Sequence, residues 1–196
     1  MIAFLRGQVF EKHPNRLVVD VGGVGYDVQV PLSTFYTAGE PGTEIALRIH
    51  THVREDQLSL YGFATALELT MFERLIAVSG IGPKLALSVL SGIETRDLIG
   101  AILRNDLARL TAIPGVGKKT AERMCVELRD RMPKAVATGA VPSPGDALRE
   151  DLVSALSNLG YHRQAIDKSL DKLVSDVGEQ RFEDVLRSAL KDLSRA

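Results

Sequence analysis

The sequence predicts an α+β protein of several domains, with a small β-barrel first and two helical regions after it. Short β-branched runs separated by glycine turns occupy residues 1–63. From Ala64 the apolar residues recur at helical spacing, and residues 134–146 are rich in Ala, Gly, Pro and Val with few helix signals. We therefore predict a barrel domain over 1–63, an all-α domain over 64–133, a flexible linker over 134–146 and a three-helix domain over 147–196.

The first region contains five runs with strand-like composition. They cover residues 2–10, 16–21, 24–30, 45–53 and 58–63, and Gly7 is expected to interrupt the first of them. Several short strands in about 60 residues indicate a small barrel or sandwich, and a five-stranded OB-type barrel fits the count.

The middle region predicts two helix–turn–helix units. Pro83 suits the first position of a helix, where its missing N–H has no intrahelical partner to lose. Thr95 and Asn105 are N-cap candidates for two further helices. The last helix of the region is expected over 118–132, because Pro133 follows it.

Three amphipathic helices are expected after the linker, with apolar positions spanning 148–159, 166–174 and 182–193. Gly160 suits the left-handed conformation at the end of the first of them. About 50 residues is near the lower limit for independent folding, so this region reads as a small adaptor.

A repeated turn is the strongest functional signal in the chain. In Ser79–Lys84 and again in Pro114–Lys119, an apolar helical stretch meets Gly-x-Gly and then a new helix with lysine in its first turn, 35 positions apart. Glycine lets the backbone approach an anion closely, and the free N–H groups and dipole of the new helix face that anion. Two such turns in tandem predict a grip on a nucleic-acid backbone.

Charge supports that interpretation. The net charge is −4 over residues 1–73, +5 over 74–134 and −2 over 135–196, so the repeat lies in the basic part of a chain whose overall charge is −1. The predicted phosphate contacts are backbone N–H groups near four glycines, with four side chains supplying charge: Gly80, Gly82, Gly115, Gly117, Lys84, Lys118, Lys119 and Arg123. Phosphate contacts carry no base information, so binding should be independent of sequence and strongly dependent on salt.

Several function classes are not indicated. The nucleotide-binding pattern Gly-x-x-x-x-Gly-Lys-Ser/Thr is absent, because Lys119 follows Gly117-Lys118 and position 112 is alanine. The single cysteine, Cys125, allows no disulfide framework or cysteine metal cluster, and we expect a small buried thiol. We expect no cofactor and no catalytic residue, and without a signal peptide or an apolar span the default location is the cytoplasm.

Glu55 and Asp56 form an acidic pair between the last two predicted strands. Adjacent carboxylates in a hairpin turn are most often solvated turn residues. In a nucleic-acid-binding protein they could instead repel phosphates from a place where strands are not wanted. A divalent-metal nuclease site is a third alternative, but no companion carboxylates or histidines have supporting spacing.

Taken together, these segments resemble the bacterial Holliday junction RuvA family. The resemblance covers residues 1–134 closely and is looser beyond them, although Leu159-Gly160-Tyr161 fits. The matching stretches are Met1-Ile2 with Leu5-Arg6-Gly7, Val21–Tyr26, Val53–Asp56, Leu60–Phe63, Gly80–Leu87 and Pro114–Arg123.

The resemblance implies an N-terminal OB-fold β-barrel, a middle tandem helix–hairpin–helix domain and a C-terminal three-helix, UBA-like domain. It implies a four-fold symmetric homotetramer that holds a four-way DNA junction open and square-planar, or an octamer in which two tetramers sandwich the DNA. Glu55 and Asp56 would match an acidic pin near the crossover. Residues 147–196 would dock the hexameric ATPase RuvB, with the resolvase RuvC as a further partner, and the chain itself would not be an enzyme.

Two other classes stay open at this point. A helix–hairpin–helix DNA glycosylase shares the pattern around 113–121, but it wants a catalytic aspartate roughly 20 residues beyond the hairpin and often four cysteines. The stretch 135–142 contains no acid, and the chain contains one cysteine. A plain duplex-DNA clamp with no junction preference is the remaining alternative.

Overall fold

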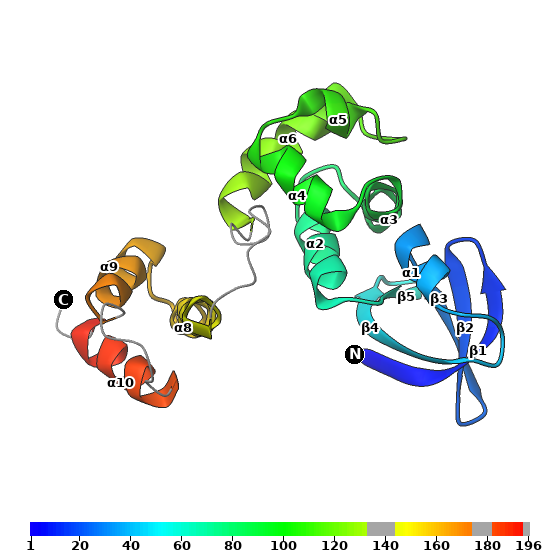
Figure 1. The fold of residues 1–196 in the computed structure, drawn as a ribbon, viewed down its shortest axis with the longest axis horizontal. Coiled ribbons are helices and arrows are strands. Elements are labelled where there is room, and N and C mark those ends of the chain that lie inside the picture. The colour runs from blue at the N-terminus through cyan, green and yellow to red at the C-terminus, as the bar shows by residue number, and fades with distance from the viewer. Residues whose placement is uncertain (133–143, 174–181, 194–196) are drawn as a thin grey trace. The chain divides into compact units, whose positions relative to one another are not determined.

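The computed structural model describes residues 1–132, 144–173 and 182–193, which belong to two compact units (Figure 1). The first unit, residues 1–137, contains the barrel and the helical hairpins. The second unit, residues 138–196, contains the C-terminal helices.

Five strands close into a barrel in the order β1-β2-β3-β5-β4. Strands β3 and β5 pair in parallel and all other pairs are antiparallel, which is the arrangement expected of an OB-fold. The strands are β1 (Phe4–His13), β2 (Arg16–Val21), β3 (Val24–Gln29), β4 (Glu44–Val53) and β5 (Leu58–Phe63). The β-barrel predicted for this region is therefore confirmed.

Gly7 does not interrupt β1, contrary to the expectation, and the strand runs through it to His13. A Cβ atom at this position would lie 2.1 Å from the carbonyl oxygen of Asp20 on the neighbouring strand. Glycine is thus required for the close approach of β1 and β2 rather than for a break. The pairing shifts instead between Val9 and Glu11, and Phe10 in this bulge is exposed.

A short helix, α1 (Leu32–Thr37), follows β3 and was not expected from the sequence. It connects the barrel to the helical region. The Ser33 hydroxyl donates to the Glu68 carboxylate, and the Leu32 N–H donates to Ser91 Oγ at 3.0 Å. Glu68 is buried and also completes the capping box of the next helix with Thr65.

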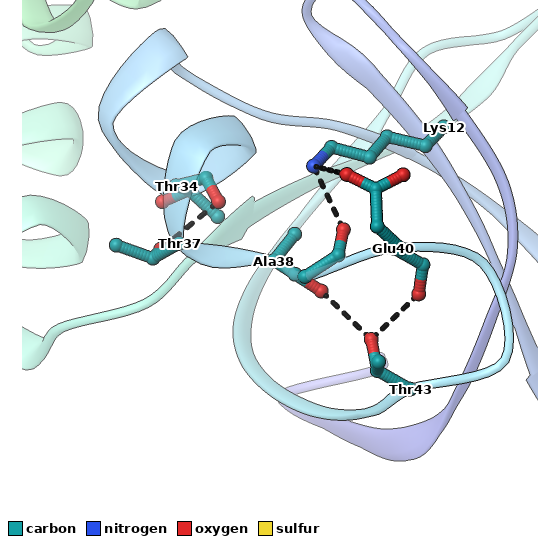
Figure 2. A network of polar contacts seen from close by, with 7 residues as sticks. Lys12, Thr34, Thr37, Ala38, Glu40 and Thr43 are labelled. Carbon is teal, nitrogen blue, oxygen red and sulfur yellow. Dashed lines mark hydrogen bonds and ion pairs between the residues drawn. The ribbon is translucent and has the colours of Figure 1, made fainter.

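Polar contacts within the loop and from Lys12 of β1 fix the loop between α1 and β4 (Figure 2). Thr43 Oγ1 lies 3.3 Å from the Ala38 carbonyl oxygen and 2.7 Å from that of Glu40. Lys12 Nζ donates to the Gly39 carbonyl oxygen at 2.7 Å and lies 3.7 Å from the Glu40 carboxylate. The contacts of Lys12 tie the loop to β1.

The helical region consists of five α-helices and a final 3₁₀ turn. They are α2 (Ala66–Ile76), α3 (Pro83–Gly92), α4 (Thr95–Leu103), α5 (Leu107–Thr111), α6 (Lys118–Leu128) and η1 (Arg129–Arg131). Pro83 occupies the first position of α3 as predicted.

The predicted N-caps Thr95 and Asn105 are wrong by one residue each. Glu94 caps α4, and its side chain accepts from the Asp97 N–H, so Thr95 is already helical. Asp106 caps α5 by accepting from the Arg109 N–H, while Asn105 takes a left-handed conformation with φ of 56°. Aspartate is as good an N-cap residue as asparagine, which explains why Asp106 rather than Asn105 caps α5.

The barrel and the hairpins share a strand. Leu60 of β5 packs in the barrel core, whereas Tyr61 and Phe63 belong to the core of the helical region. The ring centroids of Tyr61 and Phe63 lie 5.0 and 4.9 Å from that of Phe72 on α2. The aromatic side chains of β5 therefore fix α2 against the barrel.

The second unit contains α8 (Pro144–Asn158), α9 (Arg163–Leu173) and α10 (Phe182–Leu193) around its own apolar core. Gly160 has a φ of 91°, which confirms the left-handed turn. Helix α8 begins at Pro144, inside the stretch expected to be linker, and residues 134–143 of that stretch lie outside the described residues. No helix in the described ranges is long and apolar enough to cross a membrane.

Candidate nucleic-acid interface

The two Gly-x-Gly turns have the same backbone geometry. Gly80 and Gly115 are left-handed, with φ of 90° and 86°. Gly82 and Gly117 then serve as N-caps of α3 and α6, with extended conformations of φ −89°, ψ 171° and φ −84°, ψ 168°. The 35-residue repeat in the sequence is therefore a repeat in structure.

Hydrogen bonds repeat with the same offset. The Ile81 N–H donates to the carbonyl oxygen of Val78 at 3.0 Å, and the Val116 N–H donates to that of Ile113 at 3.0 Å. Ile81 and Val116 are both buried, with exposures of 4% and 5%, so each turn is anchored by an apolar side chain while its glycines stay exposed. Each turn is thus fixed to the core by its buried side chain, and its glycines face solvent.

Helices α3 and α6 lack side-chain caps, unlike the other α-helices of this region. The Gly82 and Gly117 caps offer no side chain, whereas Thr65, Glu94 and Asp106 cap α2, α4 and α5 through side-chain oxygens. The first N–H groups of a helix have no intrahelical partner and are satisfied by a cap, water or a ligand. At α3 and α6 those donors are available to an external anion.

The space around these donors is open. A Cβ atom built at Gly82 or Gly117 meets no heavy atom within 4 Å. The four predicted cationic side chains are all exposed: Lys84, Lys118, Lys119 and Arg123. Each hairpin therefore presents backbone donors and positive charge to solvent at one place, which is the chemistry that binds a phosphodiester.

The hairpins also contact each other, which the sequence did not reveal. Arg123 Nη1 on α6 donates to the carbonyl oxygen of Ser79 at 3.1 Å and lies 3.4 Å from its hydroxyl. In the other direction, a Cβ atom at Gly115 would lie 3.0 Å from Leu85 Cδ1 on α3. These contacts join residues 44 and 30 positions apart, so no local pattern could have identified them.

The acidic pair lies at the tip of the β4–β5 hairpin, where Val53 pairs with Leu58. Glu55 and Asp56 are exposed, and neither carboxylate makes an ion pair within the described parts of the chain. The turn is closed by the Arg54 N–H, which donates to the Gln57 carbonyl oxygen at 2.8 Å. Within a single copy of the described chain, Glu55 and Asp56 make no hydrogen bond to either Gly-x-Gly turn.

Cys125 is buried in the helical core, as predicted, with an exposure of 3%. Desolvation raises the pKa of its thiol, so little thiolate forms near neutral pH. Within the described residues, no group of three or more His, Cys, Asp and Glu side chains could hold a metal ion.

Comparison with known protein families accounts for most of the chain. Residues 1–62 match the RuvA N-terminal domain, residues 72–130 match a SAM-like tandem helix–hairpin–helix, and residues 147–194 match the RuvA C-terminal domain. The predicted order of barrel, tandem helix–hairpin–helix and C-terminal helical domain is confirmed by these matches.

Full-length relatives agree with the domain matches. The chain is 50% identical to the Holliday junction branch migration complex subunit RuvA of Solibacter usitatus, over 97% of this chain and 98% of the relative. It is 47% identical to the protein of the same name from Geotalea daltonii and 46% identical to that from Geobacter sulfurreducens, each over the full length of both chains. On these similarities the chain belongs to the RuvA family.

Proposed function

We propose that this chain binds four-way junction DNA without base preference and serves as the DNA-binding subunit of a branch migration complex. The observation that carries the proposal is the pair of uncapped, glycine-started helices with exposed lysines, repeated in structure 35 residues apart. The names of its relatives support the junction as the substrate.

The proposed assembly is a homotetramer with four-fold symmetry that holds the junction open and square-planar. Four copies of the two hairpins would grip four duplex arms, and four copies of Glu55 and Asp56 would face the centre. Phosphates near that centre would be repelled, because carboxylates gathered there would place negative charges beside those of the DNA backbone. A second tetramer on the opposite face would give an octamer.

The C-terminal unit is proposed to recruit the hexameric ATPase RuvB through residues 147–196. Its apolar core is separate from the cores of the first unit, as an adaptor requires. The chain lacks a nucleotide-binding loop, so the energy for strand movement would come from this partner. We propose the resolvase RuvC as a further partner on the same junction.

Charge reversal at both hairpins tests the proposal. Lys84→Glu with Lys119→Glu should weaken junction binding at least about a hundredfold at moderate salt. The variant loses about two phosphate contacts, and its two new carboxylates repel the DNA backbone. The matched control is Arg96→Glu with Arg187→Glu, which makes the same change in net charge at exposed positions outside the two Gly-x-Gly turns. Unchanged affinity in the hairpin variant would contradict the proposal.

The same gel-shift assay distinguishes the competing functions. A preference of the unmodified protein for a synthetic four-way junction over linear duplex supports the junction function, and equal binding favours a duplex clamp. Release of a base from damaged duplex would instead identify a glycosylase.

A further inference from the structure

Two hollows on the barrel share two side chains. One, of about 410 Å³, lies between the barrel and α3 and is lined by Lys84, Ser88 and Pro114. The other, of about 340 Å³, continues along β5 and is lined by Gln57 and Ser59. Asn15 and Gln29 line both, so the two hollows adjoin.

The ends of this pair of hollows are functionally distinct. Lys84 and Pro114 belong to the first and second Gly-x-Gly turns, so one end opens at the proposed phosphate contacts. Gln57 directly follows Asp56, so the other end reaches the acidic turn. The hollows therefore connect the two proposed DNA-contacting features along the surface of the barrel.

The shared residues offer uncommitted hydrogen-bond donors. Within the described residues, the side-chain amides of Asn15 and Gln29 make no hydrogen bond, although the Asn15 backbone carbonyl accepts from Val30 at 3.0 Å. Asn15 is exposed and left-handed with φ of 62°, and Gln29 is half-buried. An amide group can donate to a phosphate oxygen or to a sugar oxygen without carrying charge.

Among the described residues that line these hollows, the one acid is held in an ion pair. Asp27 lines the second hollow and forms an ion pair with Arg16, with Oδ1 and Nε 2.9 Å apart. A DNA strand in the hollow would thus meet amides, hydroxyls and a paired charge until it reaches Glu55 and Asp56. The repulsive groups lie beyond the end of the hollows, at the turn.

We propose that these hollows form a track, lined by Asn15 and Gln29, that carries one DNA strand from the hairpin contacts at Lys84 to the acidic turn. The inference rests on the proposed function and adds a second class of contact to it. The hairpins hold the strand by charge, and the track guides it by neutral hydrogen bonds. Asn15 and Gln29 are thereby assigned as DNA-positioning residues.

Neutral and charged contacts differ in their response to salt, which gives a direct test. Asn15→Gly with Gln29→Met removes both amides, and glycine keeps the left-handed backbone at position 15. We expect the junction Kd to rise about tenfold, the effect of two lost neutral hydrogen bonds, with an unchanged salt slope. Lys84→Ala should instead lower the slope of log K against log salt by about one.

A matched control uses equivalent residues away from the track. Asn105→Gly acts on the other left-handed asparagine of the described residues, with φ of 56°, and Gln8→Met acts on an exposed strand glutamine. This pair should bind the junction like the unmodified protein. If the Asn15 and Gln29 variant also binds like the unmodified protein, the track is refuted. The proposed function still stands in that case if Lys84→Ala weakens binding. If the unmodified protein shows no junction preference and Lys84→Ala no change, the proposed function itself fails.

Site-specific crosslinking locates the strand independently of affinity. Cys125 is buried, so Gln29→Cys would provide the only accessible thiol. Junctions with a thiol-reactive tether on one backbone phosphate at a time should crosslink at positions between the arm and the crossover. Gln8→Cys provides the control, which should not crosslink. Equal crosslinking of Gln8→Cys, or none at Gln29→Cys, would overturn the track.

Discussion

Arg123 on the second hairpin donates from Nη1 to the carbonyl oxygen of Ser79 on the first, at 3.1 Å. The contact joins α6 to the turn before α3, so one guanidinium links the two proposed phosphate-binding turns. Neighbouring phosphates on DNA have a defined spacing, so in the proposed function the distance between the two turns must suit that spacing.

The first prediction separates the charge of Arg123 from its geometry. Arg123→Lys keeps the positive charge but loses the planar guanidinium that reaches Ser79. We expect about fivefold weaker junction binding with an unchanged salt slope, measured by fluorescence anisotropy across a salt series. Ser79→Ala removes only the hydroxyl at 3.4 Å and keeps the carbonyl acceptor, so it should bind within twofold of the unmodified protein. Full binding by Arg123→Lys would mean that the contact does not set the spacing.

The second prediction separates the two kinds of glycine in each turn. Gly80→Ala or Gly115→Ala forces a left-handed alanine and should lower the free energy of unfolding by about 1–2 kcal/mol. In Gly82→Ala with Gly117→Ala, each new Cβ atom meets no heavy atom within 4 Å, and φ at both positions is ordinary for alanine. The free energy of unfolding should therefore change by less than about 0.5 kcal/mol per site. The added methyl groups should nevertheless block close approach of phosphate and weaken junction binding about tenfold.

Denaturant unfolding and gel shifts on the same samples check this division. The Gly82 and Gly117 variant should be stable and weakly binding. A stable variant that binds normally would show that DNA does not approach the backbone at these positions.

The third prediction concerns the acidic turn. Glu55→Gln with Asp56→Asn removes two exposed negative charges and keeps the size of both side chains. Junction binding should stay equal or become tighter, because repulsion of phosphates falls, while strand exchange through the junction should change rate. Gel shifts and a branch migration assay with the motor measure the two effects. Weaker binding would indicate that the pair is structural rather than repulsive.

The fourth prediction concerns the division of labour between the two units. A chain ending at residue 140 keeps both hairpins and the barrel, so it should bind the junction with unchanged affinity. It should fail to stimulate the ATPase motor. Motor-driven migration by the shortened chain would contradict the role proposed for residues 147–196.

Local patterns predicted most of the fold, and tertiary contacts explain what they missed. The five strands and the hairpin helices follow from alternating and helical periodicity, so their existence was predictable from residues such as Val18–Val21 and Leu67–Leu75. Helix α1 was missed because Pro31 suggested the end of a strand, and six residues without a capping side chain give a weak helix signal.

The candidate site was predictable in part for the same reason. The glycines and lysines of the turns form a repeat that is visible in the sequence, and the structure gives both turns one geometry. The contact between Arg123 and Ser79 and the hollows around Asn15 depend on how α3, α6 and the barrel pack. No spacing along the chain encodes them.

The strand β5 has a consequence for how the protein folds. Leu60 belongs to the barrel core, and Tyr61 and Phe63 belong to the helical core, so neither core is complete without this strand. Heat or denaturant should therefore melt the barrel and the hairpins in a single cooperative transition, with the C-terminal helices melting separately. A core substitution in the barrel would also loosen the proposed phosphate-binding turns, because it would lower the stability of both cores at once.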